Sequence, residues 1–423
     1  MDTTEYDDVM RRRQVLASLG AAALAGCSTS NLGVPRAVNP LPGEDDASAW
    51  AQQGPTPANR RHAAHVSVTD PTEAWRVEND GPVSTPAVVG ETVYLAAGVP
   101  DEGDRKYHIG ALLAVDRETG TERWRTVFDS HGGGYAGCSP IVYDGTVYVG
   151  DAGRHGLYAV DARTGDVRWT ADLGGSVNRP VVAADGVVCL AQQEYIVAFD
   201  TAGEEQWRYS KLNHTFLTTP TVVDGTVYVG SVFTGDESES VDDESSVVAA
   251  LDLQTGEVVW EAARGENFAT VSAADGRLYL AGKQTVQALD SADGSRVWSH
   301  RVDSRFGRLA VGDDAVFATD GRRAVALGRE DGGRRWEFEA DTHLRTHPTV
   351  TGESVVVSTD NPRVDDHAVT YALDVDSGDP RWTLELDGKM GYAAAVGEDR
   401  VYLPSHQTGE SGVVVGVESA NPE

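Results

Sequence analysis

Ala159-Val-Asp-Ala-Arg-Thr-Gly-Asp-Val-Arg-Trp169 is one of seven copies of a phrase that recurs along this chain. Every copy has Ala, any residue, then Asp (Gly328 in one copy), a turn that ends in Gly, and finally Trp. Together with Trp75, which precedes the first copy, these tryptophans are 38 to 53 residues apart. A period near 40 residues with several short strands in each unit is typical of a β-propeller.

Each unit contains the pattern of a four-stranded antiparallel blade. The stretch Thr221-Val-Val-Asp-Gly-Thr-Val-Tyr-Val-Gly230 has two alternating, β-branched segments joined by Asp-Gly, a strong hairpin signal. A third strand is expected to end at the Ala-x-Asp of the phrase. A turn with Gly at a positive φ follows, and the fourth strand carries the Trp.

The tryptophans are predicted to dock neighbouring blades, because a large flat side chain on the outer strand can cover the seam between two sheets. The Ala of the phrase leaves room for the indole to lie flat. The expected blade-docking residues are Trp75, Trp124, Trp169, Trp207, Trp260, Trp298, Trp336 and Trp382.

The number of blades is expected to be eight. Seven units run from first strand to Trp, at about 82–126, 136–171, 176–209, 216–262, 266–300, 305–338 and 343–384. An eighth begins at Lys389 and ends without a Trp, so the strand around Trp75 is expected to complete it. The prediction is an all-β fold over residues 72–423, an eight-bladed propeller closed by an N-terminal strand in the C-terminal blade.

The N-terminus contains an export signal. Arg12-Arg13-Gln-Val-Leu matches a twin-arginine signal, and the apolar run that follows is too short to span a membrane. Leu-Ala-Gly-Cys27 resembles a lipoprotein cleavage site, which implies a lipid on Cys27; a plain cleaved signal with an incidental Cys is the alternative. Residues 1–26 are then the signal peptide, with Met1 or Met10 as the start, and residues 27–71 a flexible tether.

The composition is strongly acidic. Asp and Glu number 66 against 35 Lys and Arg, a net charge of −31, and only four of the basic residues are Lys. Such a surface on an exported chain suggests a salt-loving archaeon. A nucleic-acid partner is not expected, because the chain has no basic stripe to neutralise phosphates.

No metal or nucleophile motif is present in the sequence. Cys138 and Cys189 are expected to be two buried thiols, although the sequence leaves their pairing open. The acidic loop 236–245 lacks the Gly and the spacing of a Ca²⁺ loop and is interpreted as a solvated loop. A resident metal is therefore not predicted.

The two faces of the propeller are expected to differ. The first-to-second and third-to-fourth turns share one face and are short in every unit. The second-to-third loops and the blade-to-blade links share the other face. Insertions occur only in this second set, at 98–110, 231–246, 359–369 and 405–412. Loop variation on one face indicates where binding takes place.

The entries of the first strands border the central channel on this elaborated face. Four cationic residues lie at those entries: Arg179, Arg308, Arg345 and His347. One interpretation is local pairing with surface carboxylates, which we favour because Arg is the usual base of this chain. The other is a funnel for a small anionic ligand.

The repeat Ala-x-Asp-x-x-Thr-Gly-x-x-x-Trp resembles that of the pyrroloquinoline quinone (PQQ) propellers over about residues 73–418. That family includes quinoprotein alcohol dehydrogenases and the bacterial outer-membrane assembly lipoprotein. The dehydrogenases would imply PQQ, Ca²⁺ or a lanthanide, a catalytic Asp and two consecutive Cys. No Cys-Cys pair occurs here, and no position matches the Asp or the metal ligands.

These observations predict a monomeric, non-enzymatic lipoprotein on the extracytoplasmic face of the cell membrane. It would present a propeller face to a protein partner or small ligand and need no cofactor. The first alternative is a PQQ-dependent dehydrogenase with PQQ and Ca²⁺ in the channel. The second is a binder of small anions for a transporter or sensor. The sequence identifies neither partner nor ligand.

Overall fold

A computed structural model describes residues 49–52, 54, 56–100, 108–128, 138–151, 156–175, 177, 179–234, 246–264, 266–302, 308–344, 346–359, 367–388, 393–406 and 411–420. Within these ranges the chain has strands and no helix. Arg12, Arg13, Cys27, Arg345 and the acidic loop 236–245 lie outside them.

The strands in chain order are β1 (Pro71–Asn79), β2 (Ala87–Val89), β3 (Thr92–Pro100), β4 (His108–Asp116), β5 (Glu122–Val127), β6 (Ile141–Tyr143), β7 (Thr146–Gly150), β8 (Gly156–Asp161), β9 (Val167–Asp172), β10 (Val182–Ala184), β11 (Val187–Ala191), β12 (Tyr195–Asp200), β13 (Glu205–Ser210), β14 (His214–Phe216), β15 (Thr221–Val223), β16 (Thr226–Phe233), β17 (Ser246–Asp252), β18 (Val258–Ala263), β19 (Phe268–Ala274), β20 (Arg277–Gly282), β21 (Thr285–Asp290), β22 (Arg296–Arg301), β23 (Arg308–Val311), β24 (Ala315–Asp320), β25 (Arg323–Gly328), β26 (Arg334–Glu339), β27 (Thr349–Val350), β28 (Ser354–Ser358), β29 (His367–Asp374), β30 (Pro380–Asp387), β31 (Ala395–Val396), β32 (Val401–His406) and β33 (Gly412–Ser419).

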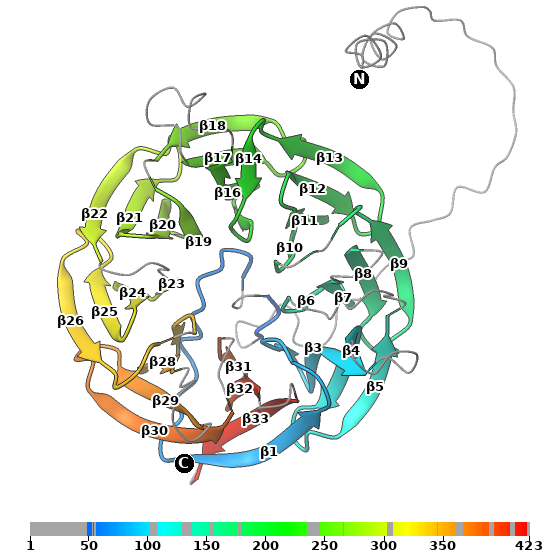
Figure 1. Ribbon diagram of the computed structural model, residues 1–423, viewed down its shortest axis with the longest axis vertical. Coiled ribbons are helices and arrows are strands. Elements are labelled where there is room, and N and C mark those ends of the chain that lie inside the picture. The colour runs from blue at the N-terminus through cyan, green and yellow to red at the C-terminus, as the bar shows by residue number, and fades with distance from the viewer. Residues whose placement is uncertain are drawn as a thin grey trace, which may run out of the picture. The chain divides into compact units, whose positions relative to one another are not determined.

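These strands form eight antiparallel sheets arranged in a ring (Figure 1). Blade 1 is β2–β5, blade 2 is β6–β9, blade 3 is β10–β13, blade 4 is β15–β18, blade 5 is β19–β22, blade 6 is β23–β26 and blade 7 is β27–β30. Blade 4 carries one additional short strand, β14, which pairs with the far end of β16. The predicted eight-bladed, all-β propeller is confirmed.

The ring closes as the tryptophan count predicts. β31, β32 and β33 form the inner part of blade 8, and β1 adds its outer strand by pairing with β33 from Pro71↔Ser419 to Asn79↔Gly412. Segments from the two ends of the chain therefore lie in one sheet, next to each other in Figure 1. Both edges of β33 are thereby paired, one with β32 and the other with β1.

The Asp-Gly turns join the first and second strands as left-handed pairs. Asp224 and Gly225 have φ values of 49° and 70°, and Asp144 and Gly145 have 50° and 67°. Two successive positive φ angles match the right-handed twist of a two-residue hairpin, and Asp and Gly are residues that tolerate them. This explains the recurrence of Asp-Gly in the sequence.

Each indole of the eight expected docking residues donates a hydrogen bond from Nε1 to a backbone oxygen ahead of it around the ring. In seven cases the acceptor lies in the next blade. It is the residue directly after the Asp of the repeated phrase, or directly after Gly328 in the one copy that has Gly there. The pairs are Trp75–Arg117, Trp124–Ala162, Trp169–Thr201, Trp207–Leu253, Trp260–Ser291, Trp298–Arg329 and Trp336–Val375. Trp382 is the eighth, and it donates to Val68 O, 2.7 Å away, just before β1.

The Ala and the Gly of the phrase make room for two different indoles. Ala250 is paired directly with Trp260 in its own blade, as Ala159 is with Trp169. The turn Gly instead lies under the Trp of the preceding blade: a Cβ on Gly256 would come within 2.6 Å of Trp207 Cδ2. Each copy of the phrase therefore supplies the Trp of its own blade and the Gly turn, or seat, on which the Trp of the preceding blade packs.

Substitution of Gly256 tests this seat against a matched control in the same blade. Gly256 and Gly225 both have a φ of +70°, but a Cβ on Gly225 would meet nothing within 4 Å. Gly225→Ala is expected to lower the free energy of unfolding by about 1–2 kcal/mol, the cost of the left-handed backbone. Gly256→Ala is expected to lose a further ~1–3 kcal/mol, because Trp207 must move. Urea denaturation measures both; equal losses would show that the indole does not depend on this Gly.

Candidate functional site in the central channel

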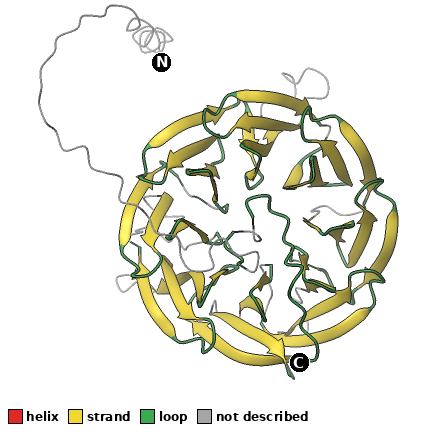
Figure 2. Cartoon of the chain, turned by 180° about the vertical axis from the view of Figure 1, so that it is seen from behind, coloured by secondary structure: helices red, strands yellow, loops and turns green. Residues whose placement is uncertain are grey.

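Residues 49–70, which the composition assigns to a flexible tether, are in contact with the blades. We call residues 50–66 the strap. In Figures 1 and 2 the strap runs inside the ring, along the inner strands, before the chain turns outward to β1. Its first residue, Trp50, is fully buried and exchanges two backbone hydrogen bonds with Val88 of β2. The boundary expected at residue 71 therefore differs from the observed one.

The strap bonds the inner strands of seven blades in order around the ring. At equivalent positions, one inner-strand N–H in each blade donates to an oxygen of the strap. The donor and acceptor residues are Val88 to Trp50, Val142 to Ala51, Ala183 to the Gln52 side chain, Val222 to Pro57, Ala273 to Ala58, Val311 to Arg60 and Val350 to Arg61. One inward-facing N–H of each of these strands is thereby satisfied by the chain itself.

The strap lies toward the face that carries the short turns. Its partner in each inner strand stands just before the first hairpin turn, as Val222 does before Asp224-Gly225. The Arg60 guanidinium contacts Asp313 Oδ1, 3.2 Å away, in the turn of blade 6. His62 lines a cavity of about 190 Å³ in the same region, between blades 6 and 7.

Two strap residues adopt left-handed backbone conformations that residues other than Gly rarely adopt. Asn59 and Arg61 both have a φ of 53° and are 3% and 5% exposed. The Asn59 amide donates to Pro220 O and to Thr221 Oγ1, each at 2.8 Å, and so holds the strap to blade 4. Non-Gly residues with such backbone strain persist only where the surrounding structure fixes them, often at functional sites.

Arg61, Arg308 and His347 form a cationic cluster inside the ring. Burial and the charge of Arg308 lower the pKa of Arg61 to about 9. Burial, Arg61 and Arg308 hold the pKa of His347 well below its usual value, so the imidazole is neutral at pH 7. His347 Nδ1 has no hydrogen-bond partner among the described residues. Positive charge at this level of the channel favours the neutral form of the imidazole.

The four residues predicted at the channel mouth are not all brought together. Arg308 and His347 are neighbours, and Arg345 lies outside the described residues. Arg179 instead donates from Nε to Leu217 O of the next link, at 2.7 Å, and burial lowers its pKa. Its pairing with a backbone oxygen is neither the salt bridge nor the funnel that the sequence suggests.

The position of each residue relative to the strap explains this difference. Arg308 and His347 stand three residues before the strap-bonded Val311 and Val350. Arg179 stands four residues before Ala183, because blade 3 has one additional residue between its Pro and the bonded position. One residue reverses the direction of a side chain along a strand. Arg61 was not predicted; Trp50 was the available clue, since a solvated tether rarely needs Trp.

The elaborated face has lengthened hairpins at three of the predicted insertions. β3 and β4 remain paired out to Pro100↔His108, β16 extends to Phe233 to receive β14, and β32 and β33 pair out to His406↔Gly412. The tips of these connections lie outside the described residues. Leu212, in the link before β14, is 87% exposed on this face.

Cys138 and Cys189 are buried free thiols, as expected. Burial raises the pKa of both, that of Cys138 to about 12. In the described ranges no three His, Cys, Asp or Glu side chains come close enough to hold a metal ion. None of the described segments is a helix of a length and hydropathy that could cross a bilayer.

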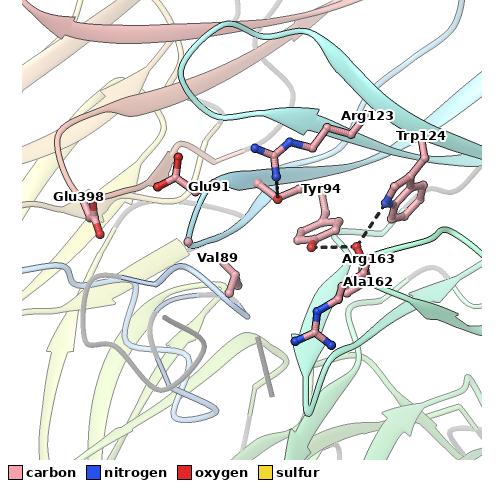
Figure 3. A pocket seen from close by; sticks show the side chains of 10 residues that line it. Val89, Glu91, Tyr94, Arg123, Trp124, Ala162, Arg163 and Glu398 are labelled. Carbon is pink, nitrogen blue, oxygen red and sulfur yellow. Dashed lines mark hydrogen bonds between the residues drawn. The ribbon is translucent and has the colours of Figure 1, made fainter. Parts of the chain in front are cut away.

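A larger cavity, of about 470 Å³, lies where blades 8, 1 and 2 meet, away from the cationic cluster. Figure 3 shows Tyr94 and Trp124 both donating to Ala162 O beside it. Arg123 donates to Thr92 Oγ1 in the same lining. Trp124 and its acceptor residue Ala162 form one part of the lining, and charged side chains, among them Glu91, Arg163 and Glu398, form another.

Asn59 is the position that tests the strap most simply. Asn59→Ala leaves two buried acceptors without their donor and places Ala at a positive φ, so the free energy of unfolding is expected to fall by about 2–4 kcal/mol. Asn59→Gly removes the same hydrogen bonds but tolerates the backbone, and its loss is expected to be about 1–2 kcal/mol smaller. Wild-type urea midpoints for both variants would mean that the strap is not held at this residue.

The chain was compared with known proteins. The family model described as outer membrane protein assembly factor BamB matches residues 108–281, 192–306 and 282–421. The BamB of Salmonella typhimurium is 36% identical over 93 residues, which cover 22% of this chain and 23% of the relative. The chain thus spans less than a quarter of that relative's length in the alignment.

Two solved structures share the architecture. BamB from Moraxella catarrhalis has a TM-score of 0.62 and 21% identity, over 84% of this chain and 99% of that one. Quinohemoprotein alcohol dehydrogenase from Comamonas testosteroni has a TM-score of 0.70 and 15% identity, over 92% and 84%. At these identities the likeness concerns the fold alone. Because the family model matches residues 108–421, about three quarters of this chain, the chain belongs to the BamB family of PQQ-like β-propellers.

Proposed function

We propose that this protein is an extracytoplasmic, lipid-anchored binding protein that presents the elaborated face of its propeller to a protein partner. The observation that carries the proposal is the difference between the two faces. The strap and the short turns occupy one face, whereas the lengthened hairpins, β14 and the exposed Leu212 all lie on the other. The family description, a protein assembly factor, supports a partner that is itself a protein.

The anchor is proposed from the sequence, through Arg12, Arg13 and Cys27. The apolar run between them is too short to span a bilayer, so attachment rests on the lipid. Neither the composition nor the fold assigns this protein to an outer membrane, and the partner is proposed by class only.

The dehydrogenase alternative is supported less well. Its cofactor would need carboxylate-binding cations, which Arg61 and Arg308 could supply, and in addition a metal ligand set. The described residues bring no three metal-ligating side chains together, and the sequence has no Cys-Cys pair. The residues present therefore do not fit the PQQ–metal group, and we derive no reaction from it.

The partner face is tested by photo-crosslinking in living cells with the full chain. A benzoylphenylalanine at Leu212 or at Thr234, both exposed on the elaborated face, is expected to yield the same discrete protein adduct. The same group at Asp224, exposed in the hairpin turn of blade 4 on the opposite face, serves as the control and is expected to yield none. Equal adducts from all three positions, or none from Leu212 and Thr234, would contradict the proposal.

The anchor is tested by fractionation. The wild-type chain is expected in the membrane fraction after alkaline washing, and Cys27→Ser is expected to move it to the soluble exported fraction, since the lipid is lost. Substitution of both Arg12 and Arg13 by Lys is expected to retain the uncleaved chain inside the cell. Membrane retention of Cys27→Ser would show that another contact provides the anchor.

A further inference from the structure

In the seam between blades 8 and 1, an arginine fills the space beside the docked Trp. Arg400 ends the first hairpin turn of blade 8 and donates to Arg117 O of blade 1, 2.8 Å away. The same oxygen accepts the indole N–H of Trp75. The Arg400 guanidinium also contacts Glu118 Oε2, at 3.0 Å, one residue beyond that acceptor. It therefore binds a carbonyl oxygen and a carboxylate at once, which suits the planar group of Arg better than the ammonium of Lys.

The seam between blades 5 and 6 repeats this arrangement. Arg277, at the same place after the first hairpin turn of blade 5, donates to Arg329 O of blade 6 at 3.1 Å. Trp298 donates to the same oxygen. The guanidinium contacts Glu330 Oε2, at 2.6 Å, again one residue beyond the acceptor. We call these two the filled seams, because each holds one arginine between the docked Trp and an acid.

The seam between blades 6 and 7 has the same acceptors but no arginine. Within the described residues, Val375 O accepts a single hydrogen bond, from Trp336 Nε1 at 3.0 Å. Asp376 follows this acceptor directly, as Glu118 and Glu330 follow theirs. The Asp376 side chain has no ion-pair or hydrogen-bond partner in the part of the chain that the structure describes. A carbonyl oxygen and a carboxylate are therefore both available to a guanidinium here.

Ala315 stands at the position of the missing arginine. It ends the first hairpin turn of blade 6 and pairs with Gly328, as Arg277 pairs with the phrase Asp of blade 5. The cavity of about 190 Å³ between blades 6 and 7 is lined by Ala315, together with Asp314 and Asp376. The space that an arginine side chain occupies in the filled seams is thus open in this one.

The charges around this cavity favour a cation. Asp313 is paired with Arg60 of the strap, at 3.2 Å. Asp314 and Asp376 form no ion pair within the described ranges. Arg335 also lines the cavity, but it is exposed, so solvent and salt screen its charge. Two carboxylates against one exposed guanidinium leave the lining with an excess of negative charge.

The larger cavity between blades 1 and 2 provides the contrast. Thr92 stands at the arginine position there, but the residue after the acceptor Ala162 is Arg163 in place of an acid. Ala162 O also accepts from both Tyr94 and Trp124. This seam is open as well, yet it has neither the carboxylate nor the spare carbonyl capacity that a guanidinium needs.

We propose that the cavity between blades 6 and 7 is a socket for an arginine side chain on a short segment of a protein partner. The guanidinium donates to Val375 O and to the Asp376 carboxylate, and its aliphatic part packs beside Ala315 and Phe317. The occupant is a peptide-borne arginine because that is the group the filled seams hold. The socket lies on the short-turn face, two blades from the control position Asp224, and does not depend on the elaborated face binding a partner.

The test is saturation-transfer NMR of the full chain with N-acetylarginine amide as the probe. Saturable binding is expected, and the citrulline analogue, which has the same shape without the charge, is expected to bind at least about tenfold more weakly. Asp376→Asn is expected to weaken binding of the arginine probe roughly ten- to a hundredfold, since it removes the charged acceptor. Asp185→Asn, at an exposed turn of blade 3 on the same face, is the matched control and is expected to bind as the wild type does.

A second measurement fills the socket from within the chain. Ala315→Arg is expected to raise the melting temperature and to abolish probe binding, and addition of Asp376→Asn is expected to remove the gain in stability. Thr92→Arg, the same change in the seam that contains Arg163, is expected to do neither. The proposal is overturned if the arginine probe does not bind, if the citrulline analogue binds equally well, if Asp376→Asn and Asp185→Asn have equal effects, or if folded Ala315→Arg still binds the probe. Should Ala315→Arg fail to fold, the two Asp variants decide alone.

Discussion

A propeller must satisfy the inward edge of every inner strand, where a row of backbone groups faces the axis with no further strand to bond. In this protein the strap performs that task in seven blades, one inner N–H per blade, in chain order from Val88 to Val350. The same segment then leaves the interior and becomes β1, the outer strand of blade 8. One continuous stretch of chain therefore closes the ring on its inside and on its outside. The contents of the channel, Arg61 above all, depend on this path.

The blades are held to one another by Trp–Gly contacts, each of which joins two neighbouring blades. Each phrase provides a Trp that reaches forward and a Gly turn that receives the Trp behind it, so a blade is complete only between neighbours. These contacts differ at blade 8, where segments from the two ends of the chain meet. Trp382 bonds Val68 of the incoming chain instead of a turn, and Trp75 lies over Gly416 in place of the usual Ala. Blades 8 and 1 are also linked by Arg400, which bonds Glu418 within blade 8 and Glu118 of blade 1.

Features with local chemistry could be predicted from the sequence. The Asp-Gly hairpins follow from backbone preference, the Ala–Trp pairing follows from size, and the closing strand follows from a tryptophan missing at one end and present at the other. The strap could not be predicted, because it bonds mainly through its backbone carbonyl groups, which any residue supplies. The surroundings of Arg179 could not be predicted for a different reason. When the blades are aligned by their Pro, the additional residue before Ala183 is hidden, and a shift of one residue reverses the direction of a side chain. Arg61, whose pKa is lowered by the nearby charge of Arg308, belongs to the presumed tether, so no pattern within the repeats could reveal it.

The central claim is that the strap is an integral part of the ring. Residue-resolved hydrogen exchange of the native, full-length chain tests it most directly, by following the backbone amides of Val88, Val142, Val222, Ala273, Val311 and Val350. Since each of these donates to the strap, all six are predicted to exchange as slowly as amides in the centres of the blades, through the same global opening. Fast exchange of these six amides while the rest of the inner strands stay protected would show that the strap leaves the ring in solution, and would contradict the account.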